Sequence, residues 1–489
     1  MTALPRTSAE VSGLAERAAG AAPRVARTGD DTLAAALRLI ADRLDASRGE
    51  LVPVAADESH LSEHRLTGEL GRTTFQLRLF AQLLGDGSTH GLIVDHPDPD
   101  WPAGPRPDLR RCLVPLGPVA VFAASNFPFA FSVAGGDTAA ALAARCPVIV
   151  KAHPGHPKLS DLTGEIVAAA LAEAGLPAGT FAVVYGDQAG VDLVRHPLVR
   201  AVAFTGSQHG GRALFDLACS RPEPIPFYGE LGSLNPVVVT RAAAAARRAD
   251  IIAGFVASYS LGAGQFCTKP GLLIVPADAG FEEPLAAAVR DVGPAPLLND
   301  RIAAAYELAG AQLASHDSVR AVVTGQPMPA GPSPSLLAIE ARQLADQSDA
   351  LMIECFGPTS VIVPYRDQAE LLAVIAKLPG QLTATVHGES GDPDAAELVT
   401  ALADRAGRII WNGWPTGVSV TWAQHHGGPY PATISPLHTS VGTTAISRFQ
   451  RPVTYQDMPD RLLPAVLHRA SERSLPARID GVLVTGKQP

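Results

Sequence analysis

The chain is organised around two motifs, Phe-Tyr-Gly-Glu-Leu-Gly-Ser-Leu-Asn-Pro at residues 227–236 and Gly-Ala-Gly-Gln-Phe-Cys at 262–267. Glu230 closes an apolar strand, and an Ala-rich helix predicted over 242–261 carries the chain back toward it. A thiol acts as a nucleophile when its pKa is lowered or a base lies beside it. A carboxylate partly desolvated at a strand end can have its pKa raised toward neutrality and serve as that base. The motifs predict a Cys267 nucleophile with Glu230 as general base, against the commoner alternative of a buried structural cysteine.

Apolar runs alternate with helical segments from Gly117 onward. The predicted strands are 118–124, 147–151, 181–185 and 200–204, and the helices between them are 134–145, 160–174 and 187–195. Buried runs joined by helices indicate a parallel sheet, whose ligands lie beyond the carboxyl ends of the strands. Those ends carry Asn126, Lys151, Asp187 and Thr-Gly-Ser at 205–207. The sequence therefore predicts that the chemistry gathers at one edge of the sheet.

A second αβ region is predicted from Asn235 to about Trp414. Its predicted strands are 271–275, 359–363 and 408–411, and its helices are 281–292, 299–314, 368–377 and 393–406. The proline-rich residues 94–117 are expected to form an extended excursion or hairpin away from the core. Residues 448–455 are expected to form an edge strand.

Residues 1–90 are expected to be helical. Leu33, Leu37, Ile40 and Leu44 recur at helical spacing, with Asp31 or Thr32 as the cap.

A second helix is predicted over 73–84. Arg72, Gln76 and Arg78 in this part of the chain are interpreted as solvated or salt-bridging residues. The alternative is that one of them reaches a substrate anion.

Composition excludes several classes of protein. The formal net charge of -9 leaves no electrostatic footprint for nucleic acid. The five cysteines are widely spaced and form no Cys-x-x-Cys pair, which favours reduced thiols in a cytoplasm over disulfides or a zinc site. No apolar run reaches the roughly 20 residues of a membrane span, and residues 1–16 do not resemble a secretion signal.

Phe-Thr-Gly-Ser at 204–207, with Gly211 beyond it, runs from a strand into a helix. Free backbone N–H groups at such a helix start can hold a pyrophosphate. The alternative is an ordinary αβ turn. Lys151 can bond a ribose hydroxyl or phosphate, or extend its ammonium to solvent. Asn126 is an oxyanion donor or a turn cap.

Two further segments carry candidate residues. Glu354 and Phe356, in Glu-Cys-Phe-Gly-Pro, contact a cofactor or lie at a loop surface. His425 and His426 precede Gly-Gly-Pro and are assigned a loop role in preference to metal binding, so no metal site is predicted.

Taken together, these motifs occur in the same order as in the aldehyde dehydrogenase family, and the chain resembles that family over nearly its whole length. The resemblance implies that Cys267 is the nucleophile and Glu230 the general base, with Asn126 and the Cys267 N–H forming an oxyanion hole. It also implies a cofactor site lined by Lys151, Gly206, Ser207, Gly211, Leu231, Gly232, Glu354 and Phe356.

The same resemblance implies an α/β fold with three parts. These are a Rossmann-type dinucleotide-binding domain (1–93 and 118–231), an αβ catalytic domain with the cysteine (232–427), and a small β oligomerisation element (94–117 and 440–489). A homodimer or homotetramer is expected.

Within the family, Gly-Glu-Leu-Gly-Ser-Leu-Asn-Pro (229–236) and His-Gly-Gly-Pro-Tyr-Pro-Ala-Thr (426–433) resemble the α-ketoglutaric semialdehyde (2,5-dioxopentanoate) dehydrogenase branch. Phe75 and the segment after Ala432 depart from that branch. The expected reaction is oxidation of an aldehyde, such as this semialdehyde, to a carboxylic acid. Long-chain or other aliphatic aldehydes are the alternative substrates; a cysteine acyltransferase or hydrolase and a non-catalytic scaffold are remote alternatives.

The expected cofactor is NADP, with NAD possible. In NAD-preferring relatives an acidic side chain stands three positions after the strand-ending lysine, where this chain has Pro154. His153, His156 and Lys158 can add positive charge nearby.

Overall fold

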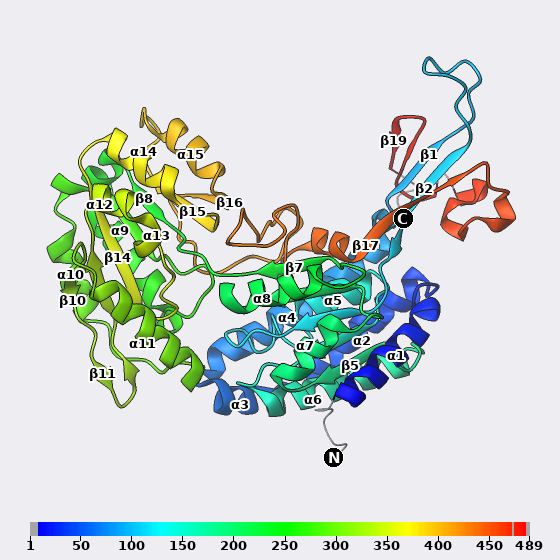
Figure 1. Cartoon of the computed structure of the whole chain (residues 1–489), viewed down its shortest axis with the longest axis horizontal. Helices are drawn as coiled ribbons and strands as arrows, with labels where there is room; N and C mark the ends of the chain where they lie inside the picture. The colour runs from blue at the N-terminus through cyan, green and yellow to red at the C-terminus, as the bar shows by residue number, and fades with distance from the viewer. Residues whose placement is uncertain (1–7, 472–473, 486–489) are drawn as a thin grey trace.

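The protein is described here from a computed structural model, which covers residues 8–471 and 474–485. Residues 1–7, 472–473 and 486–489, which fall in the predicted first and third domains, lie outside the described residues. Figure 1 shows three assemblies along the long axis: the first αβ unit in the middle, the second αβ unit at one end, and a protruding β-sheet at the other end.

The middle unit contains the predicted parallel sheet. Its strand order is β5-β4-β3-β6-β7, and every neighbouring pair is parallel. The strands are β3 (Val119–Phe122), β4 (Val148–Lys151), β5 (Phe181–Val184), β6 (Ala201–Thr205) and β7 (Phe227–Glu230). The connecting helices are α5 (Gly136–Ala143), α6 (Pro157–Glu173), α7 (Asp187–Arg195) and α8 (Gln208–Cys219). This confirms the sequence prediction, since β3 and β4 are buried along their whole length.

Four N-terminal helices pack against this unit: α1 (Ser8–Val25), α2 (Asp30–Ala46), α3 (Arg48–Ser59) and α4 (Glu63–Gly85). The four predicted apolar residues of α2 are all at most 1% exposed. The predicted cap is wrong. Helix α2 begins at Asp30, and its N-cap is Gly29, which forms no side-chain cap hydrogen bond. Asp30 instead pairs with Arg145 and His90, so a tertiary ion pair replaces the local cap.

The second αβ unit has a seven-stranded sheet of order β10-β13-β14-β9-β8-β15-β16, parallel except for the β10–β13 pair. Its strands are β8 (Val237–Val239), β9 (Leu272–Pro276), β10 (Arg320–Val323), β13 (Ser335–Ala338), β14 (Thr359–Tyr365), β15 (Gln381–His387) and β16 (Ala406–Trp411). Its helices are α9 (Arg241–Ser260), α10 (Glu282–Arg290), α11 (Asp300–Ala314), α12 (Ala341–Asp346), α13 (Ser348–Leu351), α14 (Gln368–Lys377) and α15 (Ala395–Ala403). A short hairpin joins β11 (Pro327–Met328) to β12 (Gly331–Pro332).

The third sheet has the order β17-β2-β1-β18-β19. It joins β1 (Leu92–Asp95) and β2 (Leu109–Pro115) to β17 (Gln450–Gln456), β18 (Ala477–Ile479) and β19 (Val482–Val484). The predicted hairpin is therefore present, with Asp98 and Arg106 bridged beyond the strands, and the predicted tail strand pairs with β2 in the same chain. Among the described helices, none combines the length and apolar character that a membrane crossing requires.

Candidate active site

Cys267, His426 and Glu230 meet at the junction of the two αβ units. The Cys267 Sγ lies 3.5 Å from Nε2 of His426, and the same nitrogen lies 2.8 Å from Oε1 of Glu230. Glu230 and His426 are 3% and 1% exposed, whereas Cys267 is half-buried. Helix α9 starts beyond β8 and returns the chain to the cysteine loop, as the sequence predicts. The carboxylate and thiol are thereby brought within 4.8 Å of each other.

The third member of this group was missed at the sequence level. His426 was assigned a loop role, and it is the residue that joins the acid to the thiol. The segment after it runs along the free edge of β7: Leu231 N donates to Ala432 O, Ile434 N donates to Gly229 O, and Thr433 bridges Glu230. In Figure 1 this orange segment passes between the units on its way to β17. An irregular segment rich in Gly and Pro gave no strand periodicity from which this pairing could be predicted.

The pKa of Glu230 contradicts the sequence expectation. Burial alone raises this pKa, but the charge of His426 and hydrogen bonds from His426 and Ser440 together bring it below its ordinary value. Burial and the adjacent Glu230 carboxylate raise the pKa of the Cys267 thiol well above its ordinary value. The group therefore rests as a thiol beside a carboxylate, and the thiol proton has acceptors within hydrogen-bonding reach.

Asn126 lies next to the cysteine loop. Its side-chain Nδ2 donates to Gln265 O at 3.2 Å, and its backbone carbonyl accepts from the Arg65 guanidinium at 2.7 Å. The backbone N–H of Cys267 donates no hydrogen bond to any described residue. The Asn126 amide and the unpartnered Cys267 N–H are the kinds of donor that an oxyanion hole uses.

Two residues that the sequence interpretation did not single out hold the cysteine loop. Nδ2 of Asn235 donates to the carbonyls of Cys267 at 2.8 Å and Lys269 at 2.9 Å. Nζ of the buried Lys269 donates to the carbonyls of Cys355, Gly357 and Thr359 at 2.6, 3.2 and 2.7 Å. The loop with Cys267 is thereby bound to the loop that carries Glu354 and Phe356. Asn235 lies in the 227–236 motif and Lys269 lies two residues after Cys267, and their roles follow from these tertiary contacts.

Several of the predicted cofactor residues lie at or near the start of α8. Ser207 caps this helix by accepting from Gly210 N at 3.2 Å. A Cβ at Gly211 would lie 2.2 Å from Leu231 Cδ2, and one at Gly232 would lie 2.2 Å from Oε2 of Glu354. Glycine is thus needed at both places for the approach of these side chains.

The Glu354 carboxylate lies close to Gly232. Burial raises the pKa of Glu354 to about 7, and the charge of Lys269 opposes that shift. A strand-to-helix turn with free N–H groups, beside an acid able to bond hydroxyls, fits a dinucleotide. The half-buried Phe356 lies on the same loop as Glu354.

Lys151 ends β4 and is 8% exposed. Its Nζ donates to Oδ1 of Asp187 at 3.0 Å, and this pairing lowers the pKa of the Asp187 carboxyl. His156 is 1% exposed, and its ring bonds Ala124 O and Ser160, so it adds no charge at the surface of this site. Burial lowers the pKa of His153 to about 3, which keeps this ring neutral as well.

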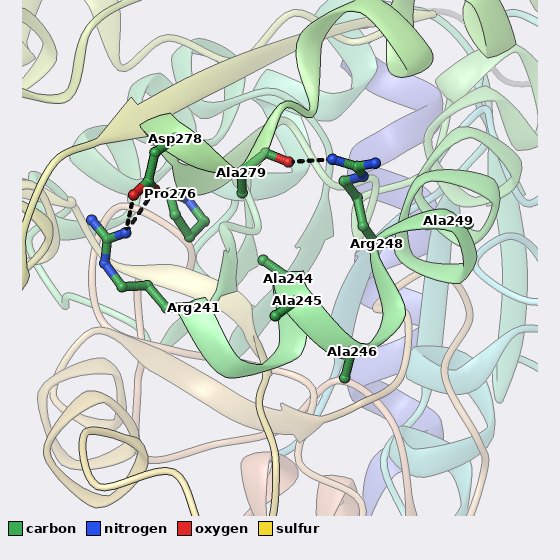
Figure 2. A pocket seen from close by; sticks show the side chains of 9 residues that line it. All are labelled: Arg241, Ala244, Ala245, Ala246, Arg248, Ala249, Pro276, Asp278 and Ala279. Atoms are coloured by element: carbon green, nitrogen blue, oxygen red, sulfur yellow. Dashed lines mark hydrogen bonds and ion pairs between the residues drawn. The ribbon is translucent and has the colours of Figure 1, made fainter.

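Figure 2 shows a surface pocket elsewhere in the second αβ unit, between α9 and residues 276–279. Arg241 pairs there with Asp278, and Arg248 donates to Ala279 O. The other lining residues are alanines and Pro276, and the carboxylate of Asp278 is held by the Arg241 guanidinium. The reactive groups of the protein lie at the junction around Cys267.

This fold, with a cysteine and a glutamate beside a dinucleotide-type turn, defines the class of protein. The chain belongs to the aldehyde dehydrogenase family, whose sequence model matches residues 2–431. It is an NAD(P)-dependent aldehyde dehydrogenase.

Two relatives define the branch. The chain is 47% identical to α-ketoglutaric semialdehyde dehydrogenase 2 of Azospirillum brasilense, over 92% of this chain and 87% of that protein. It is 43% identical to α-ketoglutaric semialdehyde dehydrogenase of Acinetobacter baylyi, over 91% of this chain and 86% of that protein. The family and branch inferred from the motifs are confirmed.

Solved structures confirm the fold. Glyceraldehyde-3-phosphate dehydrogenase GapN of Methanocaldococcus jannaschii, complexed with NADP, matches with a TM-score of 0.75 at 17% identity, over 92% of this chain and 94% of that one. Proline utilization A of Bdellovibrio bacteriovorus matches with a TM-score of 0.78 at 18% identity, over 94% of this chain. This chain spans 47% of that protein, and so corresponds to about half of it.

Proposed function

We propose that the substrate is an aldehyde with a distal carboxylate, of the 2,5-dioxopentanoate (α-ketoglutaric semialdehyde) type. The observation that carries this proposal is the contact of Cys267 with His426 and Glu230, in a chain 47% and 43% identical to two enzymes named for that substrate. Long-chain aldehydes are the alternative that the test below distinguishes.

Each residue of the junction has a proposed step. The Cys267 thiol loses its proton to the Glu230–His426 pair, and the sulfur attacks the aldehyde carbon to give a thiohemiacetal. The Asn126 amide and the Cys267 N–H bond the oxygen that becomes negative, each such donor being worth about 3 kcal/mol. Bound NAD(P) supplies the hydride acceptor. Loss of hydride leaves a thioester on Cys267.

Water completes the cycle. After the pair has released the thiol proton to solvent, the Glu230 carboxylate, whose pKa is held below its ordinary value, takes a proton from a water molecule that attacks the thioester carbon. The C–S bond breaks, the carboxylic acid leaves, and Glu230 returns its proton to the sulfur, which restores the thiol.

The proposed dinucleotide site uses Lys151, the α8 start at Gly206 and Ser207, and Glu354 with Phe356. Gly211, Leu231 and Gly232 form its floor. We propose that NADP is accepted at least as well as NAD, because Pro154 stands where an acid would repel a 2′-phosphate. The Asp187 carboxylate would also repel a 2′-phosphate, but its ion pair with Lys151 offsets its negative charge.

Pro154→Glu is expected to move the kcat/KM ratio toward NAD. Two like charges about 4 Å apart at an effective dielectric near 20 repel by about 4 kcal/mol. Asp187→Asn is the complementary variant, and it is expected to favour NADP. A wild-type preference for NAD by about two orders of magnitude would refute the proposal.

The substrate is tested by following cofactor reduction with 2,5-dioxopentanoate, succinic semialdehyde, butanal and dodecanal. The proposal expects the highest kcat/KM for 2,5-dioxopentanoate. A preference for dodecanal would assign the chain to long-chain aldehydes instead.

The third sheet is proposed as the oligomerisation element. Its two edges among the described residues are β17 and β19, and on β19 Val482 and Leu483 are 65% and 67% exposed. Exposed apolar edge strands are normally covered. We expect at least a homodimer, and light scattering at micromolar concentration tests this. A monomer would contradict it.

A further inference from the structure

Helix α4 presents three charged side chains toward the active-site loop. Arg65, Glu69 and Arg72 stand four and three residues apart, so they lie on one face of the helix. Arg65 and Glu69 form hydrogen bonds with Asn126 and the loop that follows it. Arg65 donates to Asn126 O, and Oε1 of Glu69 accepts from the N–H groups of Phe129 and Ala130 at 2.8 and 3.0 Å.

Arg72 forms no such hydrogen bond with the described residues. Its Nη1 is buried without a hydrogen-bond partner among the described residues, and none of its nitrogens forms an ion pair with them. Its neighbour on the same helix, Arg78, pairs with Asp42 and Asp45 at 2.6 and 2.9 Å. The sequence left open which polar residue of this helix reaches an anion. The contacts exclude Arg78. Nε2 of Gln76 is also buried without a partner among the described residues, but it carries no charge, so Arg72 is the remaining cation of the three.

Two aromatic rings connect Arg72 to the reacting groups. The guanidinium lies 5.4 Å from the Phe131 ring and 5.9 Å from the Phe127 ring. The Phe131 ring is 6.4 Å from the His426 ring, and Phe127 is 5.4 Å from Phe266, the residue before Cys267. Burial lowers the Arg72 pKa, and the charges of Glu69, Cys267 and Glu230 oppose that lowering.

A buried guanidinium nitrogen that lies near two aromatic rings and forms no hydrogen bond to a carboxylate is costly unless an anion joins it. Arg also has a planar fork of donors that matches a carboxylate. We propose that Arg72 binds the distal carboxylate of the substrate while Cys267 attacks the aldehyde at the other end. This rests on the proposed function, and it assigns the preference for acid-terminated aldehydes to one residue. Phe127 and Phe131 hold the guanidinium in place.

The test compares an anionic substrate with an uncharged one of the same length. Succinic semialdehyde and butanal are assayed with the wild type, Arg72→Met and Arg72→Lys. In Arg72→Met the ratio of kcat/KM for succinic semialdehyde over that for butanal should fall on the order of 10- to 100-fold, mainly through KM. Arg72→Lys keeps the positive charge but loses the planar fork of donors, so its kcat/KM ratio should lie between those of the wild type and Arg72→Met.

Arg78→Met is the matched control. It removes the same charge from the same helix at an exposed salt bridge, and its substrate ratio should equal that of the wild type. A second readout needs no turnover: binding of 2-oxoglutarate, measured by calorimetry, should weaken by a similar factor in Arg72→Met only.

An Arg72→Met enzyme that loses activity on both aldehydes equally, or that keeps the wild-type ratio and 2-oxoglutarate affinity, overturns the assignment. Failure of the proposed function gives a different result, since the wild type itself would then show no preference for succinic semialdehyde over butanal.

Discussion

The imidazole of His426 lies 2.8 Å from the Glu230 carboxylate although 196 residues separate them in the sequence. The link exists because the segment after His426 pairs with β7, the strand that Glu230 ends. Glu230, the proposed general base, is therefore positioned by two parts of the chain.

Replacing the thiol tests the nucleophile. Cys267→Ser should lower aldehyde oxidation by roughly four orders of magnitude or more, because a hydroxyl is a far weaker nucleophile here. Dinucleotide binding and the thermal midpoint should change little, as the substitution is nearly isosteric. Cys219→Ser, at an exposed position, is the control and should keep full activity. Substantial turnover by Cys267→Ser would refute the assignment.

Replacing the base should separate the two half-reactions. Glu230→Gln removes the proton acceptor for water, so steady-state turnover should fall by roughly 10²- to 10⁴-fold. Hydride transfer should suffer less, giving a burst of reduced cofactor followed by a stalled thioester, visible in stopped-flow absorbance. Loss of the burst with an unchanged steady rate would contradict a general-base role.

His426 is expected to act in proton transfer. His426→Gln should lower kcat on the order of 100-fold, because the thiol and the carboxylate both lose the ring nitrogen between them. It should also alter the pH profile of Cys267 alkylation by iodoacetamide. His425→Gln is the matched control, because His425 is the half-buried neighbour of His426 and, among the described residues, its side chain forms no hydrogen bond with Cys267 or Glu230. Equal behaviour of the two variants would assign His426 a structural role.

Glu354 gives a pH-dependent stability with a defined sign. Its pKa is about 7 in the folded protein against an ordinary value of 4.5, so the folded state binds the proton more tightly. The stabilisation is complete below pH 4.5 and is lost as the pH rises through about 7. The difference in unfolding free energy between wild type and Glu354→Gln should therefore fall across this interval in urea titrations. A difference independent of pH would show that Glu354 is ionised throughout.

Much of this organisation could be predicted from sequence because it is local. Strands such as β3 and β4 are continuous apolar runs, and parallel pairing brings their carboxyl ends to one edge. The β15 strand, Gln-Leu-Thr-Ala-Thr-Val-His, was not predicted. Its threonines are fully buried, and the Thr383 hydroxyl donates to Oδ1 of Asn235, a tertiary partner that single-sequence polarity does not show.

The same contrast between local sequence patterns and tertiary contacts applies to the candidate site. Glu230 and Cys267 are candidates on sequence alone because Glu230 ends a strand and Cys267 follows the Gly-rich segment after α9. His426 was missed because its place depends on pairing between distant segments. That omission also produced the wrong direction for the pKa of Glu230, since without His426 and Ser440 only burial remains to act on the carboxylate.

One buried ammonium group has a mechanical consequence. Lys269 is two residues from the nucleophile and is tied to three carbonyls of the loop that carries Glu354. Neither loop can shift by an ångström without stretching bonds to the other, so the thiol and the proposed ribose contact move as one rigid body. Any displacement of Glu354 by an arriving nucleotide is therefore transmitted to the sulfur through a single side chain.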